Sequence, residues 1–230
     1  MGDNVTSVID KQIHLDTVDV IPEAFWDQAL LYKQIMTTYY AAIKAVQVKL
    51  EVLNDELSIR TSRSPIEFIK SRLKRSESIV NKLDRYGFEK TLDNLDKIHD
   101  IAGVRVVCTY IDDIYDIANM LVKQDDVRLI QIKDYIKKPK KSGYRSLHLV
   151  IALPVYFSSE KRTMKVEIQI RTIAMDFWAS LEHDMEYKHQ HAASDNIKAE
   201  LKKCADIIHD TDQKMQKIKN ELVGIRNGTV

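Results

Sequence analysis

Residues 166–171 read Val-Glu-Ile-Gln-Ile-Arg and alternate strictly between apolar and polar side chains. A two-residue period is that of a β-strand, so the three apolar residues face one side of a sheet and Glu167, Gln169 and Arg171 face the other. A sheet face open to solvent would produce the same alternation. The stretch therefore predicts the strand and leaves the use of its polar face open.

The neighbouring sequence extends this strand into a mixed α/β core between residues 100 and 171. Runs of β-branched and apolar residues predict strands at 104–110, 127–132, 144–153 and 165–171, with a helix at 112–123. The segment 154–162 has the length of a hairpin connection, which predicts that the last two strands pair antiparallel. Helical spacing returns at about residue 172. The fold class is therefore α+β, with a mixed β-sheet flanked by helices.

Two long helices are expected at the ends of the chain. Apolar residues from Phe25 to Leu57 recur at three- and four-residue steps, which predicts a helix over 23–57 after a polar, mobile segment at 1–22. Near the other end, residues that step by four and three form a heptad seam: Ile197, Leu201, Cys204, Ile208, Thr211, Met215, Ile218, Leu222 and Ile225. An apolar seam of this kind favours an oligomer or packing against the first helix.

A further helix is expected over 65–84, because Ser64-Pro65-Ile66-Glu67 combines a capping oxygen, a proline at the first helical position and a following glutamate. On this helix the basic and hydroxyl residues fall on one polar face: Arg72, Lys74, Arg75, Ser78 and Lys82. A solvated surface would explain such a face, and so would contact with phosphates.

The composition limits the classes of function. The chain of 230 residues has 35 basic and 34 acidic side chains, so it lacks the broad positive charge of proteins that grip duplex nucleic acid, and RNA binding is not indicated by net charge. No apolar run reaches the roughly 18 residues that span a bilayer and no signal segment is present, so we expect a cytoplasmic protein without membrane contact. Cys108 and Cys204 have no CxxC partner, which argues against a disulfide scaffold and a thiolate zinc site.

The polar residues near the predicted sheet suggest a nucleotide site. Tyr144, Ser146 and His148 share one face of their strand and follow a lysine-rich loop at 137–141 with Gly143. An aromatic plate on a polar floor with a basic rim suits an anionic aromatic ligand.

Two carboxylates could add a metal ion to this site. Asp100 precedes the strand that contains Arg105, and Glu167 lies on the alternating strand. If the two carboxylates occupy neighbouring strand positions, they could hold one Mg²⁺, a hard cation that also takes phosphate oxygens. Phosphoryl-type transfer needs such a metal together with cations on the phosphates.

Three ordered motifs carry a resemblance to a known family. They are Asp-Ile-Ala-Gly-Val-Arg at 100–105, Lys-Asp-Tyr-Ile at 133–136 with Pro139-Lys140 and Gly-Tyr-Arg-Ser-Leu-His at 143–148, and Glu-Ile-Gln-Ile-Arg-Thr at 167–172. Together they resemble the synthetase domain of the RelA/SpoT superfamily over roughly residues 60–190. With only helices on either side, the chain is similar to the single-domain small alarmone synthetases.

The resemblance implies a nucleotidyltransferase-like sheet that moves the β,γ-pyrophosphate of ATP to the 3′-hydroxyl of GTP or GDP, producing AMP and the stringent-response alarmones pppGpp or ppGpp. It assigns Asp100 and Glu167 to Mg²⁺, with Glu167 also the base for the attacking hydroxyl. ATP would contact Arg72, Lys74, Ser78, Lys82 and Arg105, with the two arginines on the adenine. The acceptor GTP or GDP would contact Lys140, Tyr144, His148, Gln169 and Asp176, with guanine stacked on the tyrosine.

The hydrophobic periodicity and the resemblance together divide the chain, and the resemblance adds an expected quaternary state. We expect a mobile segment at 1–22, a helix at 23–58, the catalytic domain at 59–190 and an oligomerising heptad helix at 191–230, and a homotetramer is the expected assembly. His-Asp pairs lack the helical array that a phosphohydrolase needs, so synthesis without hydrolysis is expected.

Two positions depart from the family pattern, and one alternative function stays open. Asp176 stands where asparagine is frequent, and Gln131 stands where the long enzymes carry a charged residue. The sequence does not separate GTP from GDP as the acceptor, nor does it identify an allosteric regulator. A helical scaffold or RNA-binding module without catalysis is the alternative. It does not explain the carboxylates beside the basic residues, because carboxylates repel phosphate unless a metal ion lies between them.

Overall fold

The computed structural model describes residues 23–188 and 195–226, so the predicted mobile segment 1–22 lies outside the described residues. The chain divides into two compact units, 1–35 and 36–230. The described part of the first unit forms the opening turns of helix α1 (Glu23–Thr61), and the second unit contains every other element. No helix among the described residues is long and apolar enough to span a membrane.

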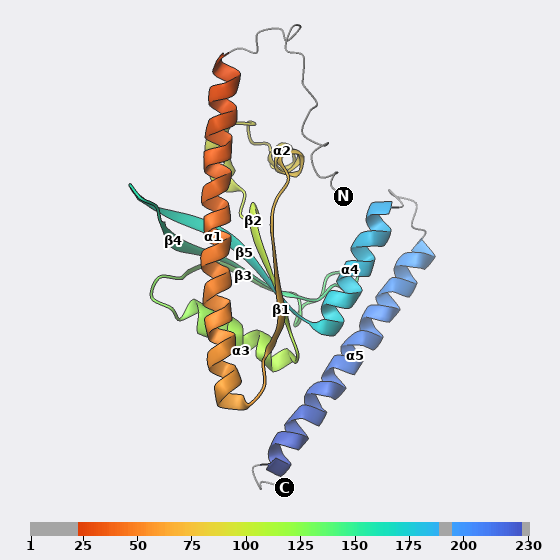
Figure 1. Ribbon diagram of the computed structural model, residues 1–230. Helices are drawn as coiled ribbons and strands as arrows, with labels where there is room; N and C mark the ends of the chain where they lie inside the picture. The colour runs from red at the N-terminus through yellow and green to blue at the C-terminus, as the bar shows by residue number, and fades with distance from the viewer. Residues whose placement is uncertain (1–22, 189–194, 227–230) are drawn as a thin grey trace, which may run out of the picture. The chain divides into compact units, whose positions relative to one another are not determined.

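A five-stranded mixed sheet forms the centre of the second unit (Figure 1). Its strands are β1 (Ile66–Leu73), β2 (Ala102–Cys108), β3 (Arg128–Asp134), β4 (Leu147–Tyr156) and β5 (Lys161–Thr172). They lie in the order β1-β2-β5-β4-β3, with β2 and β5 parallel and the other neighbours antiparallel. The predicted antiparallel pairing of the last two strands is thus confirmed, as is the α+β class.

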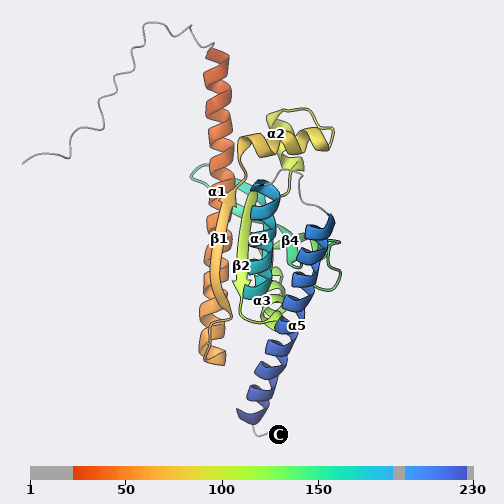
Figure 2. The ribbon, with the colours of Figure 1, turned by 90° about the vertical axis from the view of Figure 1, so that its right-hand side faces the viewer.

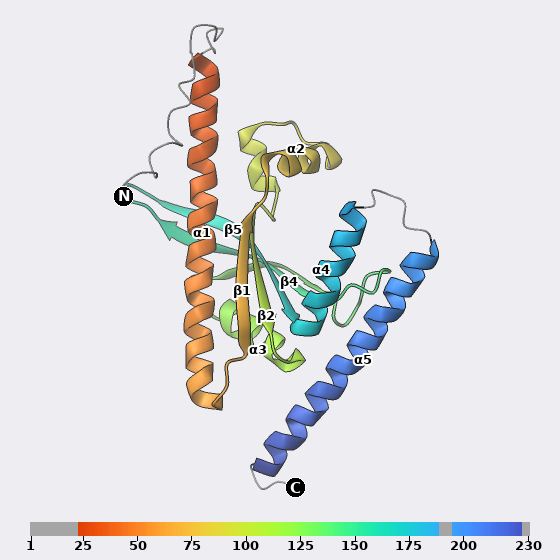
Figure 3. The same ribbon diagram turned by 45° about the vertical axis from the view of Figure 1, so that its right-hand side comes forward.

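Helices cover both faces of this sheet. They are α2 (Ser76–Arg85), the 3₁₀ helix η1 (Leu92–Lys97), α3 (Ile111–Val122), α4 (Ile173–Lys188) and α5 (Asp195–Arg226). The part of α1 from Met36 onward and α3 lie on one side of the sheet, and α4 lies on the other with α5 beside it (Figures 2 and 3). The side chains beneath α1 and α3 are apolar and buried, among them Val104, Ile151 and Ile168. The opposite face carries the polar side chains of the alternating strands.

The helix predicted over 65–84 is wrong in its first half, because residues 66–73 form the edge strand β1. The pairing of β1 with β2 is irregular between Ile66 and Phe68, so a bulge interrupts the strict alternation. Ile66, Ile69 and Leu73 are consequently spaced as on a helix face. The helix begins only at Ser76, and Arg72 and Lys74 therefore reach the site from a strand and from the connection after it.

The strand predicted over 144–153 also begins later than expected. Strand β4 starts at Leu147, so Tyr144 and Ser146 lie in the preceding loop. Gly143 has a positive φ of 93°, a conformation that suits glycine and turns the chain just before Tyr144. The loop side chains nevertheless point to the same polar region as His148, since the Tyr144 hydroxyl lies 2.8 Å from His148 Nε2.

The predicted long C-terminal helix is present as α5, and its two faces differ in exposure. The face turned to the rest of the chain is small or polar, with Ala205, Asp212 and Gln216 buried. The heptad seam remains largely exposed, and Met215, Ile218 and Leu222 each keep about half or more of their surface in solvent. The seam is therefore still available to another apolar surface.

The sheet core makes a direct stability prediction. Ile151 on β4 is fully buried, so Ile151→Ala should lower the free energy of unfolding by about 2–5 kcal/mol through lost burial and a residual cavity. Ile132→Ala on β3 is the matched control, because its side chain is 56% exposed. Urea unfolding measures both, and equal losses would contradict the assigned packing.

Candidate active site

The polar face of the sheet is organised in two rows that run across all five strands. Paired positions on β1, β2, β5, β4 and β3 form the central row, which consists of Lys70, Arg105, Gln169, His148 and Lys133. The second row lies two residues along each strand and consists of Arg72, Gly103, Glu167, Val150 and Gln131. Because paired residues share a face, the sheet gathers these side chains from distant parts of the sequence.

Asp100 lies two residues before β2, and two lysines hold its carboxylate. Lys74 Nζ is 2.9 Å and Lys82 Nζ is 2.8 Å from Oδ2. The other oxygen, Oδ1, is buried and has no hydrogen-bond partner. Burial raises the pKa of this carboxyl, but hydrogen bonds from Lys82 and Lys74 outweigh burial and keep the pKa below its ordinary value. Asp100 is therefore ionised at neutral pH.

Glu167 is the second carboxylate of the site and faces the same region. His148 Nδ1 lies 3.3 Å from its Oε1, and Gln169 Nε2 donates to its Oε2 at 3.0 Å. Burial raises the pKa of Glu167 and the Asp100 charge raises it further, yet the contacts with His148 and Gln169 leave the pKa below the ordinary value. The Asp100 charge acts on Glu167, so the two carboxylates lie within electrostatic range of each other.

The two carboxylates have the donor chemistry that Mg²⁺ prefers. Both are ionised oxygen ligands, and Asp100 Oδ1 is a buried acceptor to which no donor is directed. Within 23–188 and 195–226 no group of three or more His, Cys, Asp or Glu side chains forms a complete protein cage for a metal. Mg²⁺ is typically held by one or two carboxylates with waters and substrate phosphates, so a two-carboxylate site suits it.

Two of the residues predicted to bind ATP contact Asp100, and the others come from α2 and from the strands β1 and β2. Lys74 and Lys82 contact Asp100 directly, and Ser78 is exposed one turn before Lys82 on α2. Arg72 and Arg105 lie on neighbouring strands and share a face. Burial lowers the pKa of Arg105, and the charges of Arg171 and Arg72 lower it further. Guanidinium groups crowded in this way favour an anionic or aromatic ligand between them.

The residues predicted to bind the acceptor cluster around Tyr144. Its hydroxyl contacts His148, and its ring meets the rings of His148 and Tyr135 edge to face. Lys140 Nζ lies 4.6 Å from the centre of the Tyr144 ring and 5.1 Å from that of Tyr135. The Tyr144 ring is thus in contact with a lysine, whose ammonium group gains a cation–π interaction.

Arg171 is the central residue that sequence reasoning left without a role. Only 4% of it is exposed, and it donates to the Tyr144 hydroxyl at 2.6 Å, to Gln169 at 3.1 Å and to Ser146 at 3.4 Å. Its other partner is Asp176, at 3.1 Å. The strict alternation of 166–171 already placed Arg171 on the polar face; what was missing was its burial.

The two departures from the family pattern occupy different surroundings. Asp176, in the first turn of α4, pairs with Arg171 and also with Arg105 at 3.2 Å, so two cations balance its buried charge. Arg105 is predicted to bind ATP and Asp176 to bind the acceptor, so this ion pair joins the two predicted groups of residues. Gln131 lies at the β3 end of the second row and is exposed.

Comparison with known proteins agrees with this geometry. Residues 71–192 match the family described as the region found in RelA/SpoT proteins. The chain is 44% identical over 210 residues to the GTP pyrophosphokinase YwaC of Bacillus subtilis, covering 91% of this chain and 97% of the relative.

Solved structures give the same result. The small alarmone synthetase 2 of Bacillus subtilis superposes with a TM-score of 0.76 at 46% identity, covering 83% of this chain and 98% of the other. The small alarmone synthetase 1 of that organism, bound to its product pppGpp, gives 0.77 at 34% identity, covering 84% and 98%. The similarity therefore extends well beyond the family motifs to nearly the whole of each relative.

The two lysines on Asp100 predict a pH dependence of stability. A carboxyl whose folded pKa is depressed adds stability above its unfolded pKa, and this stability is lost as the pH falls through the folded pKa. Replacing Lys74 and Lys82 together by Met removes the groups that depress this pKa. In metal-free buffer, the unfolding free energy of the double variant should fall less steeply on acidification than that of the wild type. Lys90→Met, which breaks the exposed Lys90–Asp84 pair, should retain the wild-type slope, whereas equal slopes in all three proteins would disprove the role of the lysines.

Proposed function

The chain belongs to the RelA/SpoT family, and within it to the small alarmone synthetases, and we propose that the polar face of its sheet is the catalytic surface. The protein is a GTP pyrophosphokinase: it transfers the β,γ-pyrophosphate of ATP to the 3′-hydroxyl of GTP or GDP. A bond forms between the 3′-oxygen and the β-phosphorus, the bond from that phosphorus to the α-phosphate oxygen breaks, and AMP leaves. The products are pppGpp or ppGpp.

The observation that supports this surface is that two ionised carboxylates, Asp100 and Glu167, lie within electrostatic range of each other and that two lysines contact Asp100. Glu167 is ionised at neutral pH and lies beside His148, so it can accept the proton of the attacking 3′-hydroxyl. Lys74 and Lys82 can exchange Asp100 for the phosphates of ATP, with Ser78 on the same helix as a further donor. Arg72 and Arg105 then bind the adenine from adjacent strands.

Mg²⁺ is the proposed cofactor, with Asp100 and Glu167 as its protein ligands. The buried, undirected oxygen of Asp100 supports this assignment. When bound, Mg²⁺ supplies charge neutralisation to the phosphate oxygens as negative charge shifts during transfer. The lysines and arginines of the site orient the donor and hold its charge, and they exclude misaligned binding.

The acceptor is proposed to bind on the Tyr144 side of the site. Guanine stacks on the Tyr144 ring once Lys140 leaves it for the acceptor phosphates, a move that replaces a cation–π contact by an ion pair. His148, Gln169 and Asp176 lie within the same hydrogen-bonded cluster and contact the remaining nucleotide groups. The buried Arg171 holds Tyr144 and Asp176 in place for this purpose.

A scaffold or RNA-binding role without catalysis is the weaker alternative. It gives no reason for Asp100 and Glu167 to remain ionised beside phosphate-binding cations, whereas pyrophosphate transfer uses both signs of charge. The discriminating observation is AMP formation when the protein is mixed with ATP, GDP and Mg²⁺.

Glu167→Gln should lower the rate of AMP formation by at least about 100-fold, because the variant loses the proton acceptor and an anionic metal ligand. The fold should be retained, since glutamine can keep contacts with His148 and Gln169. Glu160→Gln, in the hairpin between β4 and β5, is the control and should leave the rate unchanged. A Glu167→Gln rate equal to wild type would exclude this carboxylate from catalysis.

The exposed heptad seam of α5 supports a homo-oligomer, and we propose a tetramer. Met215→Glu combined with Ile218→Glu places charges in the seam and should reduce the mass measured by light scattering. Ile208, another seam residue, is less suitable for this substitution, because it packs against Tyr144, Trp178 and Ala205 within the chain. Ile207→Glu is the matched control: Ile207 is 65% exposed on α5 but lies outside the seam. An unchanged mass for the double variant would exclude the seam as an interface.

A further inference from the structure

The loop that carries Tyr144 is in close contact with helix α5. This acceptor loop, defined here as residues 137–146, approaches the helix at Gly143. A Cβ atom added to Gly143 would lie 2.6 Å from the Cβ of Ala205, a separation that real side chains do not tolerate. Ala205 is itself 4% exposed, so it has little room to move aside.

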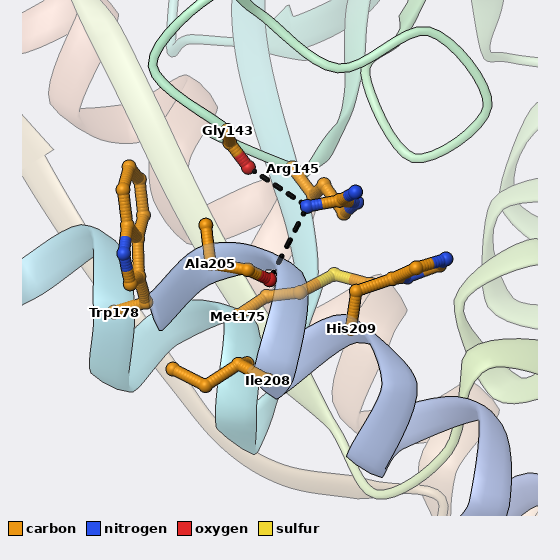
Figure 4. A pocket seen from close by; sticks show the side chains of 7 residues that line it. All are labelled: Gly143, Arg145, Met175, Trp178, Ala205, Ile208 and His209. Atoms are coloured by element: carbon orange, nitrogen blue, oxygen red, sulfur yellow. Dashed lines mark hydrogen bonds between the residues drawn. The ribbon is translucent and has the colours of Figure 1, made fainter. Parts of the chain in front are cut away.

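Arg145, on the other side of Tyr144, binds the same turn of α5 (Figure 4). It donates to the carbonyl of Ala205 at 3.3 Å and to that of Gly143 at 3.1 Å, and it pairs with Asp206 at 3.4 Å. One guanidinium group thus joins the backbone of the loop to the backbone of the helix, a task that suits its planar set of donors.

The apolar contacts continue this attachment. Tyr144 packs in one buried cluster with Trp178 and Ala205, and Leu201 and Ile208 of α5 pack against the cluster. Trp178 also donates its indole N–H to the Leu201 carbonyl at 3.0 Å, which fixes α4 against α5. Residues 143, 144 and 145 are therefore all held by the same two turns of one helix.

The hydroxyl end of Tyr144 connects the acceptor loop to the polar face of the sheet. Its hydroxyl contacts His148 and Arg171, and its ring is the proposed platform for guanine. A change of a few tenths of an ångström at Gly143 or Arg145 would move this ring relative to the sheet, while Lys74, Lys82 and Asp100 have no contact with the loop among the interactions described above. Displacement of the loop therefore acts directly on the acceptor, and it reaches the donor residue Arg105 only indirectly, through Arg171 and Asp176.

We propose that Gly143 and Arg145 are positioning residues for the acceptor nucleotide, and that α5 sets the position of the acceptor loop through them. The inference rests on the proposed function, because it takes Tyr144 as the guanine platform. Helix α5 then has two separate tasks: its Ala205–Asp206 turn holds the acceptor loop, and the exposed stretch of its heptad seam from Met215 to Leu222 serves assembly.

Steady-state kinetics on the full chain tests the charged part of the proposal. Arg145→Gln should raise the KM for GDP about tenfold, corresponding to the loss of a few hydrogen bonds, and leave the KM for ATP and the kcat at saturating GDP within about twofold of wild type. Asp206→Asn should shift the KM for GDP in the same direction by less. Because Asp206 also pairs with Lys202, Lys202→Met is the control that removes this second partner and keeps Arg145 in place.

The steric part is tested with glycine variants. Gly143→Ala should raise the KM for GDP at least as much as Arg145→Gln, and adding Ala205→Gly should recover part of the loss by removing the opposing methyl group. Gly87→Ala is the matched control, because Gly87 also has a positive φ, of 70°, but an added Cβ would meet nothing within 4 Å. It should leave both KM values unchanged.

Calorimetric titration of GDP onto each folded variant, with circular dichroism as the check on folding, separates this inference from the proposed function. If the wild type binds GDP but forms no AMP, the proposed function fails, while the order of GDP affinities still tests the loop. Weaker GDP binding by Arg145→Gln and Gly143→Ala, with unchanged ATP binding, supports the proposal. Unchanged GDP binding, or an equal loss for ATP, overturns it.

Discussion

The parallel pairing of β2 with β5 is the constraint on which the site depends. It sets Gly103 opposite Glu167 and Arg105 opposite Gln169, and the antiparallel neighbours on either side continue both positions into rows across the sheet. Asp100 lies just before β2, close enough for its charge to act on Glu167. A slip of one residue in this pairing would turn the polar side chains of one strand into the apolar layer under α1 and α3. The same register is therefore needed both for the apolar core and for the arrangement of the polar side chains on the opposite face.

Within this frame, the site balances its own charges through contacts that a substrate can replace. Lys74 and Lys82 neutralise Asp100, Arg105 and Arg171 neutralise Asp176, and Lys140 rests on aromatic rings. These contacts hold the cations near the positions where phosphates and bases are proposed to bind. Such preorganisation lowers the cost of assembling the site during the reaction. Asp176, between the two arginines, links the donor and acceptor regions electrostatically.

Local patterns in the sequence were sufficient for the strands β2 to β5 and the two terminal helices, whereas the roles of the site residues came from the family resemblance. They failed where the decisive contact is non-local. The bulge in β1 gave Ile66, Ile69 and Leu73 a helical spacing, and only pairing with β2 makes that segment a strand. Arg171 looked like one more exposed polar residue, because its burial depends on Tyr144 and Asp176 arriving from other elements. Likewise, the buried face of α5 could not be recognised from an apolar pattern. Its key residue, Ala205, matters because its small side chain allows Gly143 to approach the helix.

A structure of the protein with Mg²⁺ and a non-hydrolysable ATP analogue tests the central claim, that the two carboxylates and the flanking cations form one donor site. The account predicts a metal ion ligated by Asp100 and Glu167, the adenine between Arg72 and Arg105, and both lysines, Lys74 and Lys82, moved from Asp100 to the phosphates. An analogue bound away from the polar face of the sheet, or a metal ion that contacts neither carboxylate, would contradict it.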